Sequence, residues 1–419
     1  MTYERALSYL VSLNESRIKP GLERIRQALS ALGSPHFQFP HVLVGGTNGK
    51  GSVVTFMGAT LTASGYRTGL FTSPHLHSFE ERIVIGSKPV TRREFTELVS
   101  AVRATEVPLT YFEFATAMAL LHFARQKTDI AVLEVGIGGR WDATNATHPV
   151  LSVITSVAMD HEKWLGHTVE EVALEKSGIM REGNPVVVGP LDPNAVGVVL
   201  EQGSAVGARV ILYGRDFSAR PEVSGGGLHF RGLRWDIRNL VPGMKGVFQH
   251  YNAACALAGL ETLASDGFRI SQDAAARSMA SARWPGRFHE VAGQPPVIVD
   301  SAHNLAAVRA LVASLEDRGE VVWLFSSLSD KDVGSMTAEM SRLGKRFVLA
   351  PLDHPRARTA GEMAEEMAEG LDVRLVHSVG EGVEEARRQA GEKGTVVAAG
   401  SVVLAGAVLR ELGKEGFEV

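Results

Sequence analysis

The chain contains 419 residues, of which 45% are hydrophobic and 21% are charged, which is an ordinary composition for a soluble globular protein of two or three domains. Its 43 basic and 47 acidic residues give a net charge of −4, so it lacks the basic excess typical of nucleic-acid-binding proteins. The single cysteine, Cys255, excludes an internal disulfide, and the longest apolar-looking run, residues 396–409, is shorter than the roughly 20 residues of a membrane helix. We therefore expect a cytoplasmic monomer that binds neither nucleic acid nor membrane.

The first half of the chain alternates helical and extended patterns. Apolar residues at helical spacing occupy residues 22–32, and Gly33 follows as a stop signal. A short apolar strand is predicted at residues 41–44, followed by a glycine-rich turn and a helix over residues 52–63. This order is typical of a nucleotide-binding α/β unit. Further buried strands, separated by helical segments, predict a mostly parallel sheet; they lie at residues 130–133, 150–154 and 185–188.

The second half of the chain predicts a change of architecture and then a second domain. Short alternating segments among glycines predict a small antiparallel β excursion at about residues 206–238, and a helix follows at residues 251–264. After a turn signal at residues 284–287, strands and helices alternate again, as in a Rossmann-like α/β domain. We place the two domains at residues 1–286 and 287–419. The strands predicted for the second domain lie at residues 297–299, 321–324, 346–349, 373–376 and 395–398.

A glycine-rich segment at residues 45–52 lies at the first strand-to-helix turn. Glycines let successive backbone N–H groups curl toward phosphate oxygens, and the helix N-terminus adds partial positive charge. Lys50 can reach the β- and γ-phosphates, and Ser52 can place its hydroxyl on Mg²⁺, although Gly51 separates the two, unlike in a Walker A loop. The flanking strand and helix disfavour the alternative of a surface turn with an incidental lysine. The predicted ATP-binding residues of the loop are Thr47, Asn48, Gly49, Lys50, Gly51 and Ser52.

Residues 46–52 resemble the ATP loop of the Mur ligase superfamily and, more narrowly, that of the folylpolyglutamate synthase/dihydrofolate synthase family. Further segments similar to this family occur from the N-terminal helix to the last predicted strand. The resemblance implies an ATP-dependent ligase that uses two Mg²⁺ ions and joins L-glutamate to dihydropteroate, to a reduced folate, or to both.

Two strand ends in the first domain carry candidate metal ligands. Glu134 ends one predicted strand, and Asp160 and His161 follow the next. Ligands of open parallel sheets bind at the carboxyl ends of the strands, where a carboxylate can hold Mg²⁺ against nucleotide phosphates. The ordinary alternatives are a solvated loop acid and a core histidine. The family resemblance implies one Mg²⁺ on Ser52 and Glu134, and a second on Ser73, Glu134 and His161.

Other segments resemble the substrate-binding loops of the family. Residues 72–76 are similar to its mobile loop, and residues 109–114 to the segment that lines its pterin site. Tyr111 and Phe112 can stack on a flat ring and Glu113 can accept ring N–H bonds, although aromatic residues at a helix start more often belong to a core. Trp141 stands where the family has a smaller aliphatic residue. The implied substrate-binding residues are Ser73, Pro74, His75, Arg82, Thr110, Tyr111, Phe112, Glu113, Trp141, Asp142 and Ala143.

Lys176 lies in a predicted helix, where a lysine is usually a surface residue paired with an acid. The resemblance implies instead that Lys176 is carbamylated, which turns a cation into an anion able to support the metal cluster. It also implies that Lys50, His161, Lys176 and His303 are the catalytic residues.

Further residues of the nucleotide site are implied toward the second domain. Gln249 and Asn252 match a family pair that approaches the nucleotide, and Arg287 matches a linker arginine that contacts ATP. Asp300 is implied to contact the nucleotide and His303 the glutamate, whereas the ordinary roles of such residues are helix capping and solvation.

These features predict an amide-bond ligase. A carboxylate is a poor acyl donor until ATP converts it to an acyl phosphate, which the amine of glutamate then attacks with release of ADP and phosphate. Two alternatives stay open. One is another Mur-type ligase acting on a cell-wall precursor, which residues 111–113 and the lack of a UDP-binding domain before residue 41 disfavour. The other is a P-loop NTPase regulatory module, which Asp300 and His303 of a second α/β domain disfavour.

Overall fold

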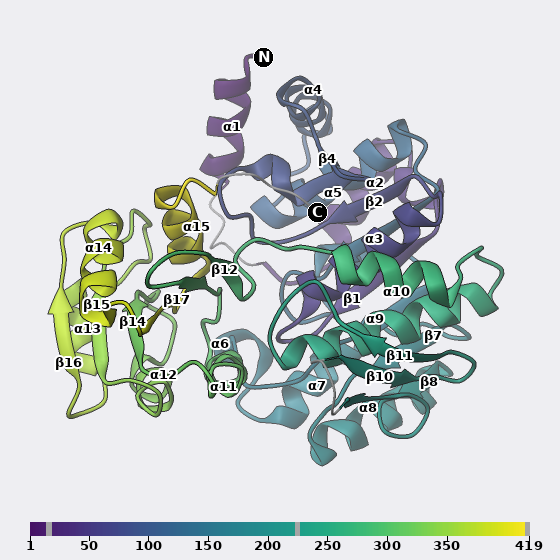
Figure 1. Cartoon of the computed structure of the whole chain (residues 1–419). Coiled ribbons are helices and arrows are strands. Elements are labelled where there is room, and N and C mark those ends of the chain that lie inside the picture. The colour runs from purple at the N-terminus through teal and green to yellow at the C-terminus, as the bar shows by residue number, and fades with distance from the viewer. Residues whose placement is uncertain (14–18, 223–226, 415–419) are drawn as a thin grey trace. The chain divides into compact units, whose positions relative to one another are not determined.

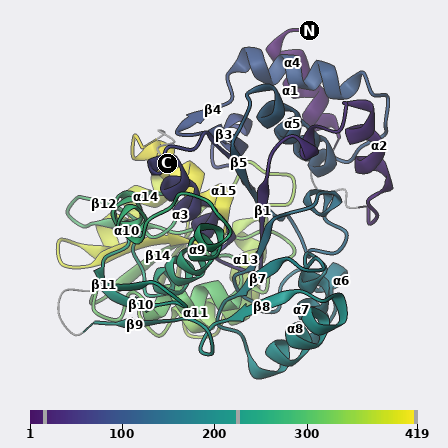
Figure 2. The same ribbon diagram turned by 90° about the vertical axis from the view of Figure 1, so that its right-hand side faces the viewer.

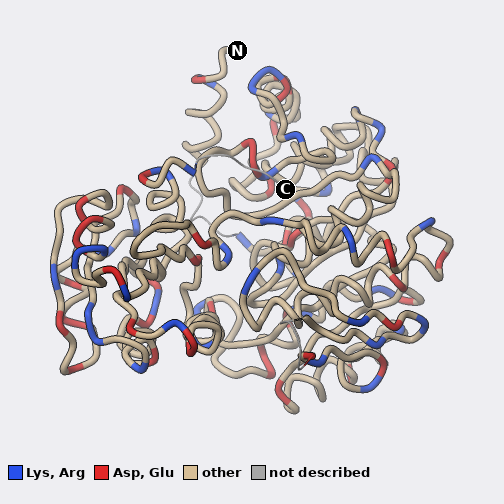
Figure 3. Tube along the Cα trace, viewed as in Figure 1, with Lys and Arg blue, Asp and Glu red and all other residues tan. Residues whose placement is uncertain are grey.

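The computed structural model describes residues 1–13, 19–222 and 227–414, which form two compact units (Figure 1). The first unit consists of Met1–Gly243 and His250–Ala282, within the described residues. The second consists of Met244–Gln249 and the described chain from Arg283 onward. Lys and Arg are interspersed with Asp and Glu in both units (Figure 3). No helix in the part of the chain that the structure describes is long and apolar enough to cross a membrane.

The first unit is built on an eight-stranded sheet with the order β4-β3-β2-β5-β1-β6-β7-β8. In this sheet order, every pair of neighbours from β2 onward is parallel. At the β4 edge, β3 pairs antiparallel with both β2 and β4. Strands β1 and β5 are buried at every position, as expected for continuous apolar runs covered by helices on both faces. The strands are β1 His41–Gly45, β2 Thr68–Phe71, β3 Ile83–Ile85, β4 Lys88–Pro89, β5 Ile130–Glu134, β6 Leu151–Ile154, β7 Pro185–Val188 and β8 Arg209–Leu212.

Helices cover this sheet. Helix α3 is buried on nearly all sides because it is apolar all round, whereas α4 has one apolar face and α1 packs against it. Helices α7 and α8 lie beside β7 and β8 (Figures 1 and 2). The helices are α1 Tyr3–Ser12, α2 Glu23–Ala31, α3 Lys50–Ala63, α4 Arg92–Arg103, α5 Tyr111–Arg125, α6 Glu162–Leu165, α7 Val169–Ser177, α8 Pro193–Val206, α9 Phe248–Ser265 and α10 Gln272–Ser281, with short 3₁₀ turns at Pro35–Phe37, Phe79–Arg82 and Ala143–Ala146.

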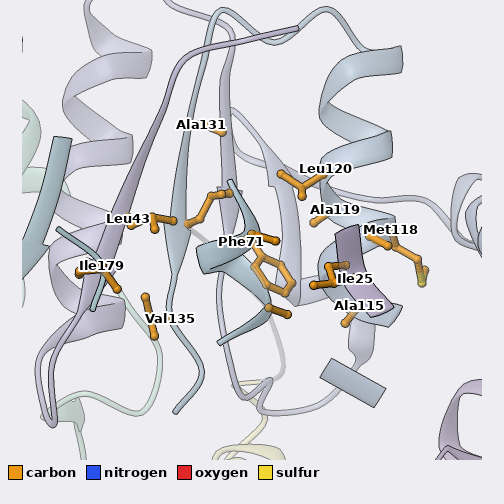
Figure 4. Packing of buried hydrophobic residues seen from close by; sticks show 14 of the residues in the cluster. Ile25, Leu43, Phe71, Ala115, Met118, Ala119, Leu120, Ala131, Val135 and Ile179 are labelled. Carbon is orange, nitrogen blue, oxygen red and sulfur yellow. The ribbon is translucent and has the colours of Figure 1, made fainter. Parts of the chain in front are cut away.

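The core of the first unit joins the sheet to α2 and α5. Phe71 of β2 is fully buried and lies beside Ile25 of α2 and Ala115 of α5 (Figure 4). Leu43 of β1 belongs to the same cluster, so β1 and β2 are held by one continuous apolar interior. This packing fixes the strand ends that carry the candidate site.

A three-stranded antiparallel sheet with the order β11-β10-β9 is attached to the first unit. Its strands are β9 Ser218–Pro221, β10 Leu228–Arg231 and β11 Asp236–Leu240. The buried carboxylate of Glu261 in α9 accepts hydrogen bonds from the backbone N–H groups of Leu233, Arg234 and Trp235, which form the turn between β10 and β11. One side chain of α9 therefore anchors this small sheet.

The second unit contains a six-stranded sheet with the order β12-β13-β17-β14-β15-β16, in which only β12 is antiparallel to its neighbour. Trp323 of β14 is fully buried, and its indole N–H donates a 3.1 Å hydrogen bond to the carbonyl of Met340. The strands are β12 His289–Val291, β13 Val297–Val299, β14 Val321–Phe325, β15 Arg346–Leu349, β16 Asp372–Leu375 and β17 Thr395–Ala399, and the helices are α11 Leu305–Ala313, α12 Val333–Met340, α13 Ala360–Glu366, α14 Val379–Ala390 and α15 Val402–Glu411.

The predicted fold class is confirmed, but one part of the prediction is wrong. The antiparallel excursion expected from about residue 206 begins only at β9, because Arg209–Leu212 forms β8, which pairs parallel with β7 in the main sheet. Residues 223–226 of the predicted excursion lie outside the described residues. The sequence patterns also missed β2, a buried strand of the parallel part of the sheet, and β3, β4 and β12, which are short strands at or next to sheet edges.

Candidate active site

The candidate site of the first unit lies where four neighbouring parallel strands end. In the order β2-β5-β1-β6, these strands all present their carboxyl ends at one edge of the sheet. Strands β5 and β6 are consecutive among the strands of the chain but lie on opposite sides of β1, so the loops that follow them diverge. Such a switch point is the usual ligand site of an open α/β sheet. Glu134 is the last residue of β5, and the segments that follow β2, β1 and β6 contain Ser73, the glycine-rich loop and His161.

The glycine-rich loop after β1 is held by the loop after β6. The backbone N–H of Thr47 donates 2.9 Å to the carbonyl of Ser156, and that of Asn48 donates 2.9 Å to the hydroxyl of Ser156. The Thr155 hydroxyl donates 2.6 Å to the carbonyl of Asn48. Gly46 has φ +142°, and a Cβ there would lie 2.0 Å from Thr155 Oγ1, so this close approach requires glycine. The sequence analysis assigns no role to Thr155 and Ser156, although both directly follow the strand predicted at residues 150–154, where ligand-site residues are expected.

Lys50 and Ser52 lie in the first turn of α3, immediately after this loop. Lys50 Nζ donates 3.0 Å and 3.1 Å to the carbonyls of Gly46 and Thr47, so the ammonium lies over the loop. Ser52 is buried and Gly51 lies between the two. Gly49 caps the helix at φ +85°, and a Cβ there would lie 2.2 Å from Asn252 Oδ1 of α9. The structure therefore places Asn252 next to the glycine-rich loop, and its contact with a nucleotide stays a prediction.

Glu134 and Ser73 meet at the ends of β5 and β2. Glu134 is buried, and its Oε2 accepts a 2.9 Å hydrogen bond from the backbone N–H of Ser73. Ser73 precedes Pro74 in a cis peptide bond. Two of the predicted metal ligands are thus adjacent.

The donor set fits Mg²⁺ bound together with a nucleotide. The described residues contain no group of three or more His, Cys, Asp or Glu side chains able to hold a metal ion by themselves. Mg²⁺ typically takes one or two carboxylates and completes its oxygen shell with waters and substrate phosphates. A single buried carboxylate, Glu134, with the hydroxyls of Ser52 and Ser73 matches that requirement.

His161 lies at the end of the β6 loop and begins α6. Its backbone is left-handed, with φ +52°, and its N–H donates 2.9 Å to Asp160 Oδ1. The ring Nε2 lies 4.0 Å from the same oxygen. Asp160 therefore orients His161, and both stand at the sheet edge predicted for them.

Lys176 is 3% exposed, so it is not the surface lysine that a helix usually carries. Burial, the largest cause, and the nearby charge of Lys50 lower the pKa of Lys176 to about 7, against the opposing effects of Asp160 and Asp142. The amine is consequently neutral in a large fraction of molecules at neutral pH, and a neutral amine is the form that reacts with CO₂.

The loop after β2 is held by Arg82 and Glu81. Arg82 is 2% exposed, donates 2.8 Å from Nε to His75 Nδ1, and places its guanidinium 5.2 Å from the centre of the Tyr111 ring. Glu81 accepts three hydrogen bonds of 2.8–2.9 Å from the backbone N–H groups of residues 76–78. His75, Arg82 and Tyr111 therefore form one cluster.

The first turn of α5 contains Thr110, Tyr111, Phe112 and Glu113. Thr110 caps the helix, and its N–H donates 2.7 Å to Glu113 Oε2 in a capping box. The Phe112 ring lies 5.7 Å from that of Phe71, and a Cβ on Gly136 would touch it at 2.8 Å. Phe112 thus lies between β2 and the loop after β5, whereas Glu113 is engaged both by Thr110 of its own helix and by Arg24 of α2.

Asp142 is buried in the loop after β5 and organises it. Its Oδ2 accepts from the N–H groups of Gly136 and Ile137 at 3.0 and 3.1 Å, and its Oδ1 accepts from the N–H and hydroxyl of Thr144. Burial raises the pKa of Asp142, although these hydrogen bonds act in the opposite direction. Ala143 is buried beside it, whereas Trp141 is 51% exposed.

The second unit places its predicted residues around the end of β13. Asp300 is buried and accepts 2.7 Å from the N–H of Phe288 and 2.8 Å from that of Ala302. Burial raises the pKa of Asp300, and the charge of Arg287 opposes this effect. The Nδ1 of His303 lies 2.8 Å from the carbonyl of Ser301. Arg287, Asp300 and His303 thus belong to one strand end of this unit, and Gln249 is also grouped with this unit and fully buried.

Comparison with known families agrees with this architecture. Residues 44–260 match the Mur ligase middle domain, and residues 286–402 match the Mur ligase glutamate ligase domain. Together with the phosphate loop and the strand-end carboxylate, these matches define an ATP-dependent ligase of the Mur class.

Individual relatives narrow this assignment. The chain is 34% identical over 388 residues to the dihydrofolate synthase/folylpolyglutamate synthase of Bacillus subtilis, covering 86% of this chain and 88% of that protein. It is 33% identical over 405 residues to the Escherichia coli protein of the same name, covering 94% and 92%. The chain therefore belongs to the dihydrofolate synthase/folylpolyglutamate synthase family of Mur ligases.

Solved structures of this family share the fold. Escherichia coli FolC in complex with DHPP and ADP has a TM-score of 0.90 and 32% identity, covering 99% of this chain and 98% of that chain. The bifunctional folylpolyglutamate synthase/dihydrofolate synthase of Yersinia pestis, complexed with AMPPNP and Mn ion, has a TM-score of 0.89 and 32% identity with the same coverage.

Proposed function

We propose that this ligase adds L-glutamate to the carboxylate of dihydropteroate, of a reduced folate, or of both, with ATP converted to ADP and phosphate. The observation that carries the proposal is the convergence of the phosphate loop, Glu134, Ser73 and His161 at the ends of four adjacent parallel strands. The names of the relatives, dihydrofolate synthase and folylpolyglutamate synthase, support this choice of substrates.

The residues of the first unit are suited to phosphoryl transfer. The N-terminus of α3 and the Lys50 ammonium, which lies over the loop, present positive charge to a transferred phosphoryl group. Two Mg²⁺ ions, when bound, would neutralise phosphate charge; we assign one to Ser52 and Glu134, and the other to Ser73, Glu134 and His161. These groups favour the acyl phosphate, whose leaving group is phosphate rather than oxide.

The acceptor carboxylate and the amine require their own binding residues. We assign the ring of the acceptor to the cluster of Tyr111, Phe112 and Arg82, because it joins two aromatic faces to a buried guanidinium. Further acceptor contacts are assigned to Ser73–His75, Thr110, Glu113 and residues 141–143. Arg287, Asp300 and Asn252 are assigned to the nucleotide and His303 to glutamate.

Lys176 is proposed to carry a carbamate. Its burial and lowered pKa of about 7 supply the neutral amine that attacks CO₂, forming an N–C bond with loss of one proton. The resulting anion would lie near Lys50, whose charge would then stabilise the modified side chain. Mass spectrometry of gently handled protein should show an addition of CO₂, and bicarbonate should stimulate the wild type but not Lys176→Ala. Full activity of an unmodified protein would refute this assignment.

The decisive experiment measures ADP release with glutamate plus either dihydropteroate or tetrahydrofolate. We expect glutamate-dependent ADP release with at least one acceptor, and loss of this activity in Lys50→Ala with an unchanged circular dichroism spectrum. Near-normal turnover by Lys50→Ala would exclude its phosphate role. No release with either acceptor would refute the proposed substrates.

A further inference from the structure

Arg24 of α2 forms a contact with the first turn of α5 across 89 residues of sequence. Its Nε donates a 3.2 Å hydrogen bond to Glu113 Oε2, and its Nη2 lies 2.9 Å from Glu113 Oε1. Nη2 also donates 2.6 Å to the carbonyl of Lys19, which precedes α2. Arg24 therefore ties the start of α2 to the N-terminus of α5.

The Glu113 carboxylate is oriented by two groups that act on different sides of it. Oε2 accepts from the Thr110 N–H at 2.7 Å and from Arg24 Nε. Oε1 is buried and receives no directed hydrogen bond within the described residues, so its contact with Arg24 Nη2 is electrostatic. Thr110 restrains the side chain along the helix, and Arg24 restrains it from the neighbouring helix.

The same helical turn carries the aromatic cluster. Tyr111 faces the Arg82 guanidinium, and Phe112 packs against Phe71 and the Gly136 loop. Tyr111, Phe112 and Glu113 lie in the same turn of α5. If loss of the Arg24 contact let this turn rotate, both aromatic rings and the Glu113 carboxylate would move together. A displacement of about 1 Å in a binding group can cost up to roughly 100-fold in rate.

We propose that Arg24 is a positioning residue for the acceptor substrate, which holds Glu113 and the first turn of α5 in the orientation that binds the ring. This inference rests on the proposed function, because it takes that turn as the acceptor site. Arg24 belongs to none of the motifs that indicated a site in the sequence. Within the described residues it forms hydrogen bonds and an ion pair with Glu113 and Lys19 and none with the glycine-rich loop, so it acts through Glu113.

The test compares Arg24→Ala, Arg24→Lys and Glu113→Gln with Arg26→Ala, which alters an exposed arginine of the same helix. Steady-state ADP release is measured while the acceptor and ATP are varied separately. For Arg24→Ala we expect the KM for the acceptor to rise roughly 10-fold, with the KM for ATP and kcat changed less than about two-fold. Arg24→Lys, which keeps the charge but not the planar two-point contact, should fall between Arg24→Ala and wild type.

A double-variant cycle isolates the pair. If Arg24 acts through Glu113, then Arg24→Ala in the Glu113→Gln background should add less than two-fold to the KM for the acceptor. An equal rise in both KM values, a fall in kcat alone, or independent effects in the cycle would overturn the proposal. Thermal unfolding of each variant shows whether a change in KM reflects a loss of folded protein. If Arg24→Ala does not fold, Arg24→Lys is used in its place. Absence of wild-type activity with every acceptor would instead refute the proposed function.

Discussion

The backbone N–H of Ser73 donates a 2.9 Å hydrogen bond to the Glu134 carboxylate, and this bond joins the loops after β2 and β5 at the edge of the sheet. Phe71 and Leu133 are paired in register in the neighbouring strands β2 and β5. This register places Ser73 and Glu134, which follow them, side by side. One carboxylate oxygen of Glu134 is thus engaged by the backbone of the loop after β2.

Replacement of Glu134 by Gln should separate the structural and electrostatic roles of this carboxylate. The amide oxygen can still accept from Ser73, but the negative charge that attracts Mg²⁺ is lost. We expect ADP release to fall by roughly 100-fold or more with little change in stability. Kinetics across a magnesium titration measure the effect, with exposed Glu97→Gln as the control. Wild-type kinetics in Glu134→Gln would contradict the metal assignment.

Gly49→Ala should lower ATP affinity, whereas the same substitution at Gly65 should not. Its positive φ of +85° costs about 1–2 kcal/mol for alanine, and the new Cβ would collide with Asn252 Oδ1 at 2.2 Å. Gly65→Ala is a matched control, because φ is +92° there and nothing lies within 4 Å. Both variants should lose stability in urea unfolding, but only Gly49→Ala should lose ATP affinity. Equal ATP affinity in both variants would argue against a nucleotide site at Gly49.

Lys176 should make stability depend on pH in buffers free of CO₂. The folded-state pKa of about 7 lies below the ordinary value of 10.5, so between these values the unfolded chain binds a proton that the folded chain does not. The free energy of unfolding contributed by this residue should therefore rise with pH above about 7. The stability advantage of Lys176→Met over wild type should be largest below pH 7 and shrink toward pH 9. A pH-independent difference in urea unfolding would show that Lys176 does not titrate in this range.

Glu261→Ala should weaken the small antiparallel sheet. Three backbone N–H groups would lose their acceptor, at a net cost of about 2 kcal/mol, because water can reach part of this turn. Exposed Glu201→Gln is the control, and hydrogen exchange at residues 228–240 should report the loss locally. Unchanged exchange in this region would mean that Glu261 does not anchor the turn.

The sequence allowed β1, β5, β6 and β7 of the parallel core and the glycine-rich turn after β1 to be predicted, because strands buried on both faces read as continuous apolar runs. Strand β2 was missed, since its sequence Thr-Gly-Leu-Phe is not such a run. Arg209–Leu212 was assigned to the wrong sheet, since a short strand with an exposed first residue resembles an antiparallel edge. The burial of Lys176 and the pairing of Arg24 with Glu113 could not be predicted. Both depend on contacts between distant segments, and a local pattern carries no information on such contacts.

The hydrogen bonds from Thr155 and Ser156 to the glycine-rich loop have an energetic consequence for ligand capture. A segment that is already fixed loses little conformational entropy when its ligand arrives, so more of the interaction free energy remains as affinity. Asn48 is constrained through both its N–H and its carbonyl before any nucleotide enters. Removing the hydroxyl of Thr155 or of Ser156 should therefore slow or weaken nucleotide binding, even if neither hydroxyl contacts the nucleotide.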